Sequence, residues 1–259
     1  MKKIFIFITL LLMCASTFGG VLLAQNYARS VPPEYVPPGL STHGGFWWKF
    51  SDNSRTNIPD YGPSGTNKCW VVDPSVNATW NNGGWRLNNS TVSYVRSSDA
   101  SIMVGATCIT YAVWLKLDQQ SSNNGWIIGE TDETGQMGLR ILANSGSIDF
   151  LSYDNQIHIE ATNALSIGEW CRVVLAVSAP LPSYYQEYRI FTNGVLAQFT
   201  WKAFGVGNWV VVGHGKTTLG RVYQDPYITK GTFANAVGVR NYAWTTNDVA
   251  YDYQNASHP

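Results

Sequence analysis

The sequence contains few charged residues. Only 13% of its 259 residues are Asp, Glu, Lys or Arg, which is about half the usual share. Lys plus Arg and Asp plus Glu are equal at 17 each, so the formal net charge is zero. A chain without excess positive charge does not attract a phosphate backbone, so nucleic acid is not an expected partner. The high hydrophobic content, 45%, excludes intrinsic disorder for most of the chain.

Several catalytic and metal-binding motifs are missing as well. The sequence has no G-x-S-x-G nucleophile elbow and no glycine-rich phosphate loop that opens a helix. Its four histidines lie far apart and lack the paired spacing of metal ligands. We therefore expect a well-packed globular domain, rich in aromatic and small polar residues, without these motifs.

The first 25 residues form a segment of a different kind. Lys2 and Lys3 precede an apolar run from Ile4 to Met13, and small residues follow that run. This pattern predicts a signal peptide at residues 1–25, and a protein that is secreted or held at the cell surface. A retained signal-anchor is the alternative, because apolar residues resume at Val21–Ala24 and about 20 such residues span a bilayer.

Residues 26–43 contain four prolines, at positions 32, 33, 37 and 38. Proline disfavours both helix interiors and central strands, so we expect an extended spacer here. The remaining residues, 44–259, are expected to form one domain.

This domain shows the pattern of strands and turns. Tyr188–Thr192 and Val195–Phe199 flank Asn193-Gly194, which is typical of a hairpin with a type I′ turn. Ile109–Leu117 and Trp170–Val177 are apolar on both faces, so we expect both strands to be covered on each side. More than ten strands separated by turn residues predict an all-β fold, a sandwich of two sheets.

Three cysteines follow the leader: Cys69, Cys108 and Cys171. An odd number leaves one thiol free or paired with another molecule. If residues 108–117 and 169–178 are in-register antiparallel neighbours, Cys108 faces Ser178 and not Cys171. We therefore predict no particular disulfide among the three.

The order of motifs resembles the laminin-G-like, concanavalin A-like jelly rolls. The resemblance runs over roughly residues 44–256. It implies an antiparallel jelly-roll sandwich, and it does not specify a function. The motifs are Trp47-Trp48-Lys49-Phe50, Ile58-Pro59-Asp60, Gly62-Pro63-Ser64-Gly65, Gly84-Trp85-Arg86-Leu87, Val92–Val95, Ile109–Lys116, Gly168-Glu169-Trp170, Phe191–Leu196, Thr218-Leu219-Gly220 and Val237–Thr245.

Related jelly rolls include β-glucanases, whose E-x-D-x-E signature is similar to Glu130-Thr131-Asp132-Glu133. Cooperating carboxylates on one strand must lie at positions i, i+2 and i+4, because side chains alternate between the two faces. Position i+4 is Thr134 here, so the spacing fails. Glycoside hydrolysis needs two carboxylates that flank the bond, and we expect this protein not to be an enzyme.

The resemblance also raises the possibility of calcium. Family members often hold Ca²⁺ near one edge of the sandwich, and Asp60 stands at the matching early position. Asn235 stands where the family usually has Asp, and its neutral oxygen is a weaker ligand. We list Asp60 and Asn235 as the candidate calcium ligands.

Carbohydrate is the expected ligand. Aromatic rings stack on sugar rings, while Asn, Asp and backbone groups bind the hydroxyls. The low charge favours a neutral ligand. The resemblance assigns Trp48, Trp114 and Trp170 to the core. The candidate contacts, which lie among polar residues, are Trp80, Trp201, Trp209 and Tyr223.

Two functions remain open. The first is a non-catalytic binding module that recognises a glycan outside the cell. The alternative is a structural or adhesive subunit that binds extracellular protein or associates with itself, through residues 26–43 or an exposed strand edge.

Overall fold

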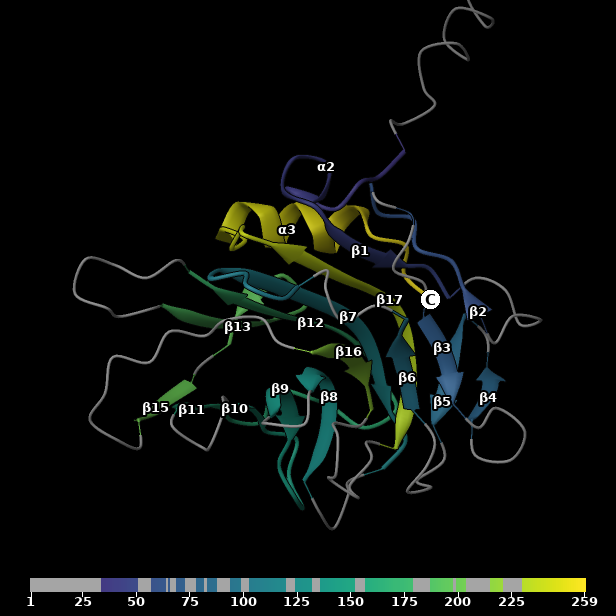
Figure 1. Ribbon diagram of the computed structural model, residues 1–259. Helices are drawn as coiled ribbons and strands as arrows, with labels where there is room; N and C mark the ends of the chain where they lie inside the picture. The colour runs from purple at the N-terminus through teal and green to yellow at the C-terminus, as the bar shows by residue number, and fades with distance from the viewer. Residues whose placement is uncertain are drawn as a thin grey trace, which may run out of the picture. The chain divides into compact units, whose positions relative to one another are not determined.

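The computed structural model describes most of the chain from residue 34 onward (Figure 1). The described residues are 34–50, 57–63, 65, 69–72, 78–81, 83–87, 94–98, 103–119, 124–131, 136–151, 157–178, 187–197, 199–203, 215–220 and 230–259. The chain divides into two units, Met1–Val36 and Pro37–Pro259. The predicted leader at residues 1–25 lies outside the described residues. Among those residues, no helix has the length and apolarity needed to cross a membrane.

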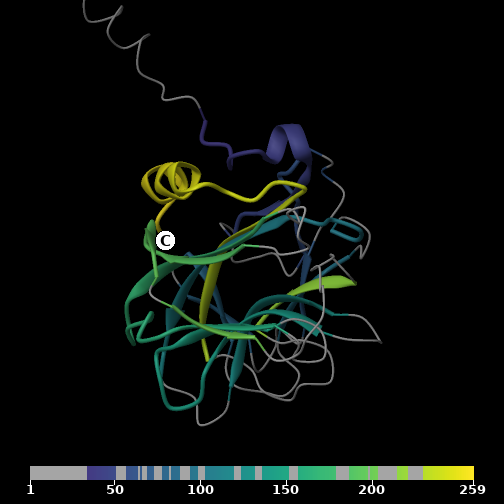
Figure 2. The same cartoon turned by 90° about the vertical axis from the view of Figure 1, so that its left-hand side faces the viewer.

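The second unit is a sandwich of two antiparallel sheets, as the two layers in Figure 2 show. This confirms the predicted fold class. The eight-stranded sheet contains β1 (Gly45–Trp48), β4 (Ala78–Asn81), β5 (Gly84–Leu87), β7 (Ile109–Leu117), β12 (Trp170–Val177), β13 (Tyr188–Thr192), β14 (Val195–Leu196) and β17 (Gly231–Arg240). The nine-stranded sheet contains β2 (Asn57–Ile58), β3 (Cys69–Val72), β6 (Tyr94–Ser97), β8 (Gly125–Thr131), β9 (Gln136–Ile141), β10 (Ile148–Leu151), β11 (Ile157–Ala161), β15 (Phe199–Ala203) and β16 (Lys216–Leu219).

The order of strands follows from their pairings. The first sheet runs β14-β13-β12-β7-β17-β5-β4, with β1 paired to β17. The second runs β15-β11-β10-β9-β8-β16-β6-β3-β2. Alternate side chains of both sheets meet between the layers and form the main core, to which β7 contributes Val113 and Leu115 and β9 contributes Leu139.

The predicted hairpin is confirmed at its turn. Asn193 and Gly194 have φ angles of 51° and 82°, as a type I′ turn requires. The second strand is shorter than expected, however, because β14 ends at Leu196. Phe199 instead begins β15, which pairs with β11 in the other sheet. The predicted single strand is thus divided between the two layers.

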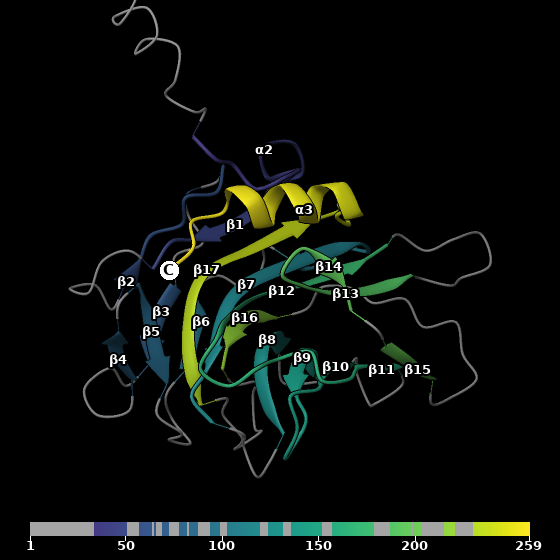
Figure 3. The same ribbon diagram turned by 180° about the vertical axis from the view of Figure 1, so that it is seen from behind.

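A C-terminal helix, α3 (Thr246–Asn255), was not predicted. It begins with a capping box, in which the side chains of Thr245 and Asp248 each accept a hydrogen bond from the other's backbone N–H. Figures 1 and 3 show α3 lying along the outer face of the eight-stranded sheet. Within the predicted spacer, residues Leu40–His43 form a short helix, α2, separated from Pro38 by Gly39, where an extended segment was expected.

The register of β7 and β12 confirms the argument about the cysteines. Ile109 lies opposite Val177, so Cys108 lies beside Ser178 in the same alignment. Cys171 lies opposite Leu115, near the other end of the pair. Cys69, Cys108 and Cys171 are free thiols in the structure.

Candidate functional site

The predicted sugar contacts lie on separate strands. Trp80 belongs to β4 and is aligned with Trp85 of β5. Trp201 belongs to β15 and is aligned with Ile159 of β11. β4 and β15 are end strands of different sheets, and Figures 1 and 3 show them far apart. The other two candidates, Trp209 and Tyr223, lie outside the described residues, so the four residues remain a prediction.

The two candidate calcium ligands already have partners. Asp60 is buried, and its Oδ1 accepts hydrogen bonds from the backbone N–H groups of Trp47 (2.9 Å) and Gly62 (2.7 Å). Asn235 lies at a bulge in β17, and its Nδ2 donates to the carbonyl oxygen of Ser257 at 3.0 Å. Each side chain therefore has a structural role that does not need an ion.

The two residues also lie on opposite sides of β1. Trp48 of this strand is aligned with Ala236 on one side and forms a bridge with Asp60 on the other. Within the described part of the chain there is no group of three or more His, Cys, Asp or Glu side chains that could hold a metal. Calcium binding at Asp60 and Asn235 stays a prediction.

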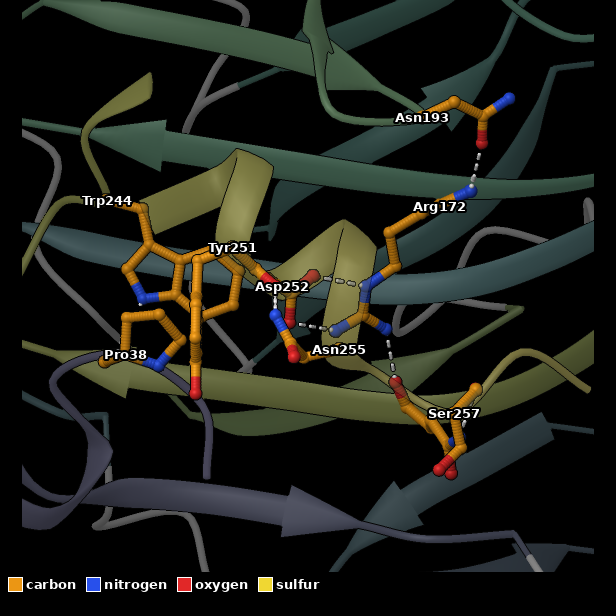
Figure 4. Close-up of polar contacts among 9 residues, drawn as sticks. Pro38, Arg172, Asn193, Trp244, Tyr251, Asp252, Asn255 and Ser257 are labelled. Atoms are coloured by element: carbon orange, nitrogen blue, oxygen red, sulfur yellow. Dashed lines mark hydrogen bonds and ion pairs between the residues drawn. The ribbon is translucent and has the colours of Figure 1, made fainter. Parts of the chain in front are cut away.

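The C-terminal helix covers part of the outer face of the eight-stranded sheet. The guanidinium of Arg172, on β12, donates from Nε and Nη2 to the carboxylate of Asp252 on α3, at 2.8 and 2.9 Å (Figure 4). Arg172 also donates from Nη1 to the carbonyl oxygen of Asn235 at 2.6 Å. Both charged side chains are almost fully buried, so this network fastens α3 to the sheet.

The tryptophan on that face is covered as well. The ring of Trp114 lies 5.9 Å from that of Tyr253 and 4.7 Å from that of His258, measured between centroids. Trp114 is therefore buried outside the main core, whereas Trp48 packs inside it and Trp170 is half-buried. The burial expected for Trp48 and Trp114 is confirmed, and neither indole is open to a ligand, whereas the core position expected for Trp170 is wrong.

The outer face of the nine-stranded sheet has a different composition. No helix within the described ranges covers it (Figure 1). Its side chains are those that alternate with core residues along each strand, and together we call them the polar face. They are Tyr94 and Arg96 of β6, Trp126 of β8, Arg140 of β9, Asp149 and Leu151 of β10, Glu160 of β11, and Lys216 and Thr218 of β16.

An ion pair lies at the centre of the polar face. Arg140 is aligned with Asp149 on the next strand, and its Nε and Nη2 donate to both carboxylate oxygens at 2.8–3.0 Å. The guanidinium carbon lies 5.9 Å from the ring centroid of Trp126, which packs with Leu151. Asp149 is fully buried, and the Arg140 side chain is 17% exposed.

The arrangement fixes a hydrogen-bond donor. Asp149 and Trp126 hold the guanidinium plane in one orientation, which leaves the N–H groups of Nη1 without an acceptor in the described part of the protein. A rigid, sheet-mounted donor beside an aromatic ring is suited to bind an oxygen atom of a ligand. Sequence analysis missed this pair, because only strand register brings residues 140 and 149 together.

The polar face also contains two adjacent carboxylates. Glu160 of β11 is aligned with Asp149 of β10. Both oxygens of Asp149 are bound by Arg140, however, so this carboxylate is not placed to attack a sugar or transfer a proton. Glu130 of the rejected E-x-D-x-E motif points into the core, where it accepts a hydrogen bond from the hydroxyl of Tyr111, while Asp132 and Glu133 lie outside the described residues.

The sequence matches the model of one protein family. A family model described as the concanavalin A-like lectin/glucanases superfamily matches residues 89–250. No curated protein matches the sequence.

Three solved structures show the same fold at low sequence identity. Trypanosoma rangeli sialidase in complex with the inhibitor DANA is 14% identical with a TM-score of 0.62, over 94% of this chain and 38% of the sialidase. Domain 4 of AbnA, an extracellular arabinanase from Geobacillus stearothermophilus, in complex with arabinotriose is 15% identical with a TM-score of 0.56, over 80% of this chain and 96% of that domain. The receptor binding domain of botulinum neurotoxin C/D mosaic serotype is 14% identical with a TM-score of 0.57, over 82% of this chain and 51% of that domain.

Proposed function

Because the chain belongs to the concanavalin A-like lectin/glucanase superfamily, we propose that it is a non-catalytic module, secreted or held at the cell surface, that recognises carbohydrate. Two proteins of similar fold support a sugar ligand: a sialidase in complex with the inhibitor DANA, and an arabinanase domain in complex with arabinotriose. The polar face is the proposed binding surface.

The observation that carries this proposal is the fixed guanidinium of Arg140. Its Nη1 is the donor that the ion pair with Asp149 leaves available. Sugar hydroxyl and ring oxygens accept such hydrogen bonds, and a donor that is held before the ligand arrives loses little entropy on binding. On the other sheet, α3 and His258 cover the outer face around Arg172 and Trp114.

The proposal of a non-catalytic role rests on the carboxylates. A glycosidase needs one carboxylic acid and a second carboxylate, both open to the substrate. Asp149, the carboxylate aligned with Glu160, is buried and bound by Arg140 on both oxygens, so it is not available to act on a substrate. Glu130 lies in the core.

A glycan array with the full chain tests the proposal. We expect saturable binding to a defined class of glycan, weakened about tenfold or more in Arg140→Lys, because lysine cannot hold Asp149 and still present a fixed second donor. Arg86→Lys is the matched control, since Arg86 forms an exposed ion pair with Asp118 on the other sheet. A thermal melt of each variant checks the fold. An array without binding, on folded protein, overturns the proposal.

A second candidate function is association with protein or with another copy of this chain. It is favoured by β14, the end strand of its sheet, whose Val195 and Leu196 are 68% and 47% exposed. An exposed apolar edge strand is able to pair with another chain. Light scattering on the protein used for the array tests this function, and a monomer at all concentrations contradicts self-association.

A further inference from the structure

Two cations gather at one end of the polar face. Arg96 of β6 is aligned with Thr218 of β16, and Lys216 precedes Thr218 by two residues on the same face of that strand. Arg96 and Lys216 are therefore diagonal neighbours on adjacent strands, at a distance that long side chains bridge easily. Both side chains are half-buried.

Among the described residues, neither cation has an acidic partner. The Nε of Arg96 is buried and makes no hydrogen bond. Among the described residues, Arg96 and Lys216 form no ion pair, unlike Arg140 on the same face and Arg172 on the other sheet. A buried donor without an acceptor and two neighbouring like charges both destabilise the free protein.

The acidic side chains of the polar face lie at its other end. Asp149 of β10 neutralises Arg140, and Glu160 lies one strand further on, at β11. β9, β8 and β16 separate these acids from Arg96, as the strand order shows. Among the described side chains the charge of this end is therefore positive, although the whole chain is neutral.

We propose that the glycan bound by this face is acidic, and that Arg96 and Lys216 bind its anionic groups. This inference rests on the proposed function and names its ligand class: a sugar that carries carboxylate or sulfate. The planar fork of Arg96 matches either anion through two hydrogen bonds, and Lys216 adds a point charge. The low overall charge favoured a neutral ligand. The two cations at this end of the polar face instead favour an acidic one, because a ligand meets the local charge and not the net charge of the chain.

The test compares three oligosaccharides by calorimetry on the full chain: an oligogalacturonate, a heparin hexasaccharide and a neutral xylo-oligosaccharide. We expect an acidic ligand to bind about tenfold or more tightly than the neutral one, with an affinity that falls as salt is added. Tight binding of the oligogalacturonate alone identifies carboxylate as the anion, and tight binding of the heparin hexasaccharide alone identifies sulfate.

Variants of Arg96 and Lys216 test whether these two residues bind the acidic ligand. Arg96→Gln and Lys216→Gln should each lower the affinity for the acidic ligand about tenfold while leaving the neutral ligand unaffected. Lys116→Gln is the matched control, because Lys116 also lies on a strand but in the other sheet. Without ligand, Arg96→Gln and Lys216→Gln should melt no lower than the parent, since each removes an unpaired charge.

The outcomes separate the two proposals. Equal binding of neutral and acidic ligands, unchanged in Arg96→Gln and Lys216→Gln, overturns the acidic ligand and keeps a sugar-binding function. No binding of any oligosaccharide overturns both. A clear fall in melting temperature for Arg96→Gln without ligand shows an internal partner for Arg96 and overturns the inference by itself.

Discussion

Arg172 of β12 and Asp252 of α3 form a bidentate ion pair closed to solvent, although 80 residues separate them along the chain. The pair joins the only long described helix to the middle of the eight-stranded sheet. It holds α3 over the outer face of that sheet around Arg172 and Trp114, whereas no helix within the described ranges covers the polar face.

Removing one partner of this pair should destabilise the protein strongly. Asp252→Ala leaves the Arg172 charge buried and unpaired, so we expect the free energy of unfolding to fall by about 3–5 kcal/mol in chemical denaturation. Asp118→Ala is the control: its exposed pair with Arg86 should cost less than about 1 kcal/mol. Equal losses in the two variants would contradict a structural role for the buried pair.

Local patterns of the sequence predicted much of the sheet but not the helix. The hairpin turn at Asn193-Gly194 and the two long strands, β7 and β12, appear where periodicity and turn residues placed them. Helix α3 was missed because it is short and rich in polar residues. Its start does carry a signal, since Thr245 and Asp248 have the spacing of a capping box.

The candidate site was harder to predict, because strand register assembles it. Arg140 meets Asp149, and Arg96 meets Lys216, only after β9 pairs with β10 and β6 pairs with β16. Nothing in the local sequence distinguishes these arginines from solvated surface residues. Tryptophans in polar stretches, such as Trp80 and Trp201, were more conspicuous, but the structure places their strands in different sheets.

The three thiols should differ in reactivity. Cys69 and Cys171 are buried and Cys108 is half-buried, and burial raises the pKa of each thiol. In the folded protein we therefore expect iodoacetamide to modify Cys108 first, and slowly at neutral pH, because little thiolate is present. Peptide mass spectrometry measures each site separately. A peptide pair joined by a Cys108–Cys171 disulfide would contradict the register of β7 and β12.

Stability should fall at alkaline pH partly through Cys171. Burial raises the pKa of this thiol to about 12, from an ordinary value of 9.0. Below pH 9.0 the thiol is protonated in both the folded and the unfolded protein, so it contributes no pH dependence to stability. Between pH 9.0 and about 12 only the unfolded chain loses the proton. The free energy of unfolding therefore falls as the pH rises through this range.

Cys171→Ala removes this contribution. The variant should lose less stability than the parent between pH 9.0 and about 12, by a difference on the order of 4 kcal/mol at the upper limit. Urea denaturation at several pH values measures the two slopes. Parallel curves would show that Cys171 does not titrate differently in the folded protein.

A side chain at position 194 should destabilise the protein. Its φ is +82°, and an added Cβ would lie 3.1 Å from the ring of Tyr253 on α3. Gly194→Ala should lower the free energy of unfolding by about 1–2 kcal/mol for the backbone strain, with a further loss from the contact. Gly168→Ala isolates the strain, because Gly168 has φ +81° with nothing within 4 Å of its added Cβ. An equal loss in both variants would show that the contact with Tyr253 adds nothing.

Asp60 should stabilise the protein without calcium. Its Oδ1 accepts two backbone hydrogen bonds, from Trp47 and Gly62, and this carboxylate fixes the turn that follows β2. Hydrogen bonds to a charged acceptor contribute about 1.5–3 kcal/mol each, so Asp60→Ala should lower the free energy of unfolding by at least that amount in EDTA.

The same variant tests the predicted ion. Calcium added to the parent protein should raise its melting temperature only if a calcium site exists, and Asp60→Ala should abolish that rise if Asp60 is a ligand. Asn235→Ala extends the test to the second candidate, whose amide otherwise holds the carbonyl of Ser257. A parent whose melting temperature is identical in calcium and in EDTA would show that Asp60 stabilises the protein without an ion.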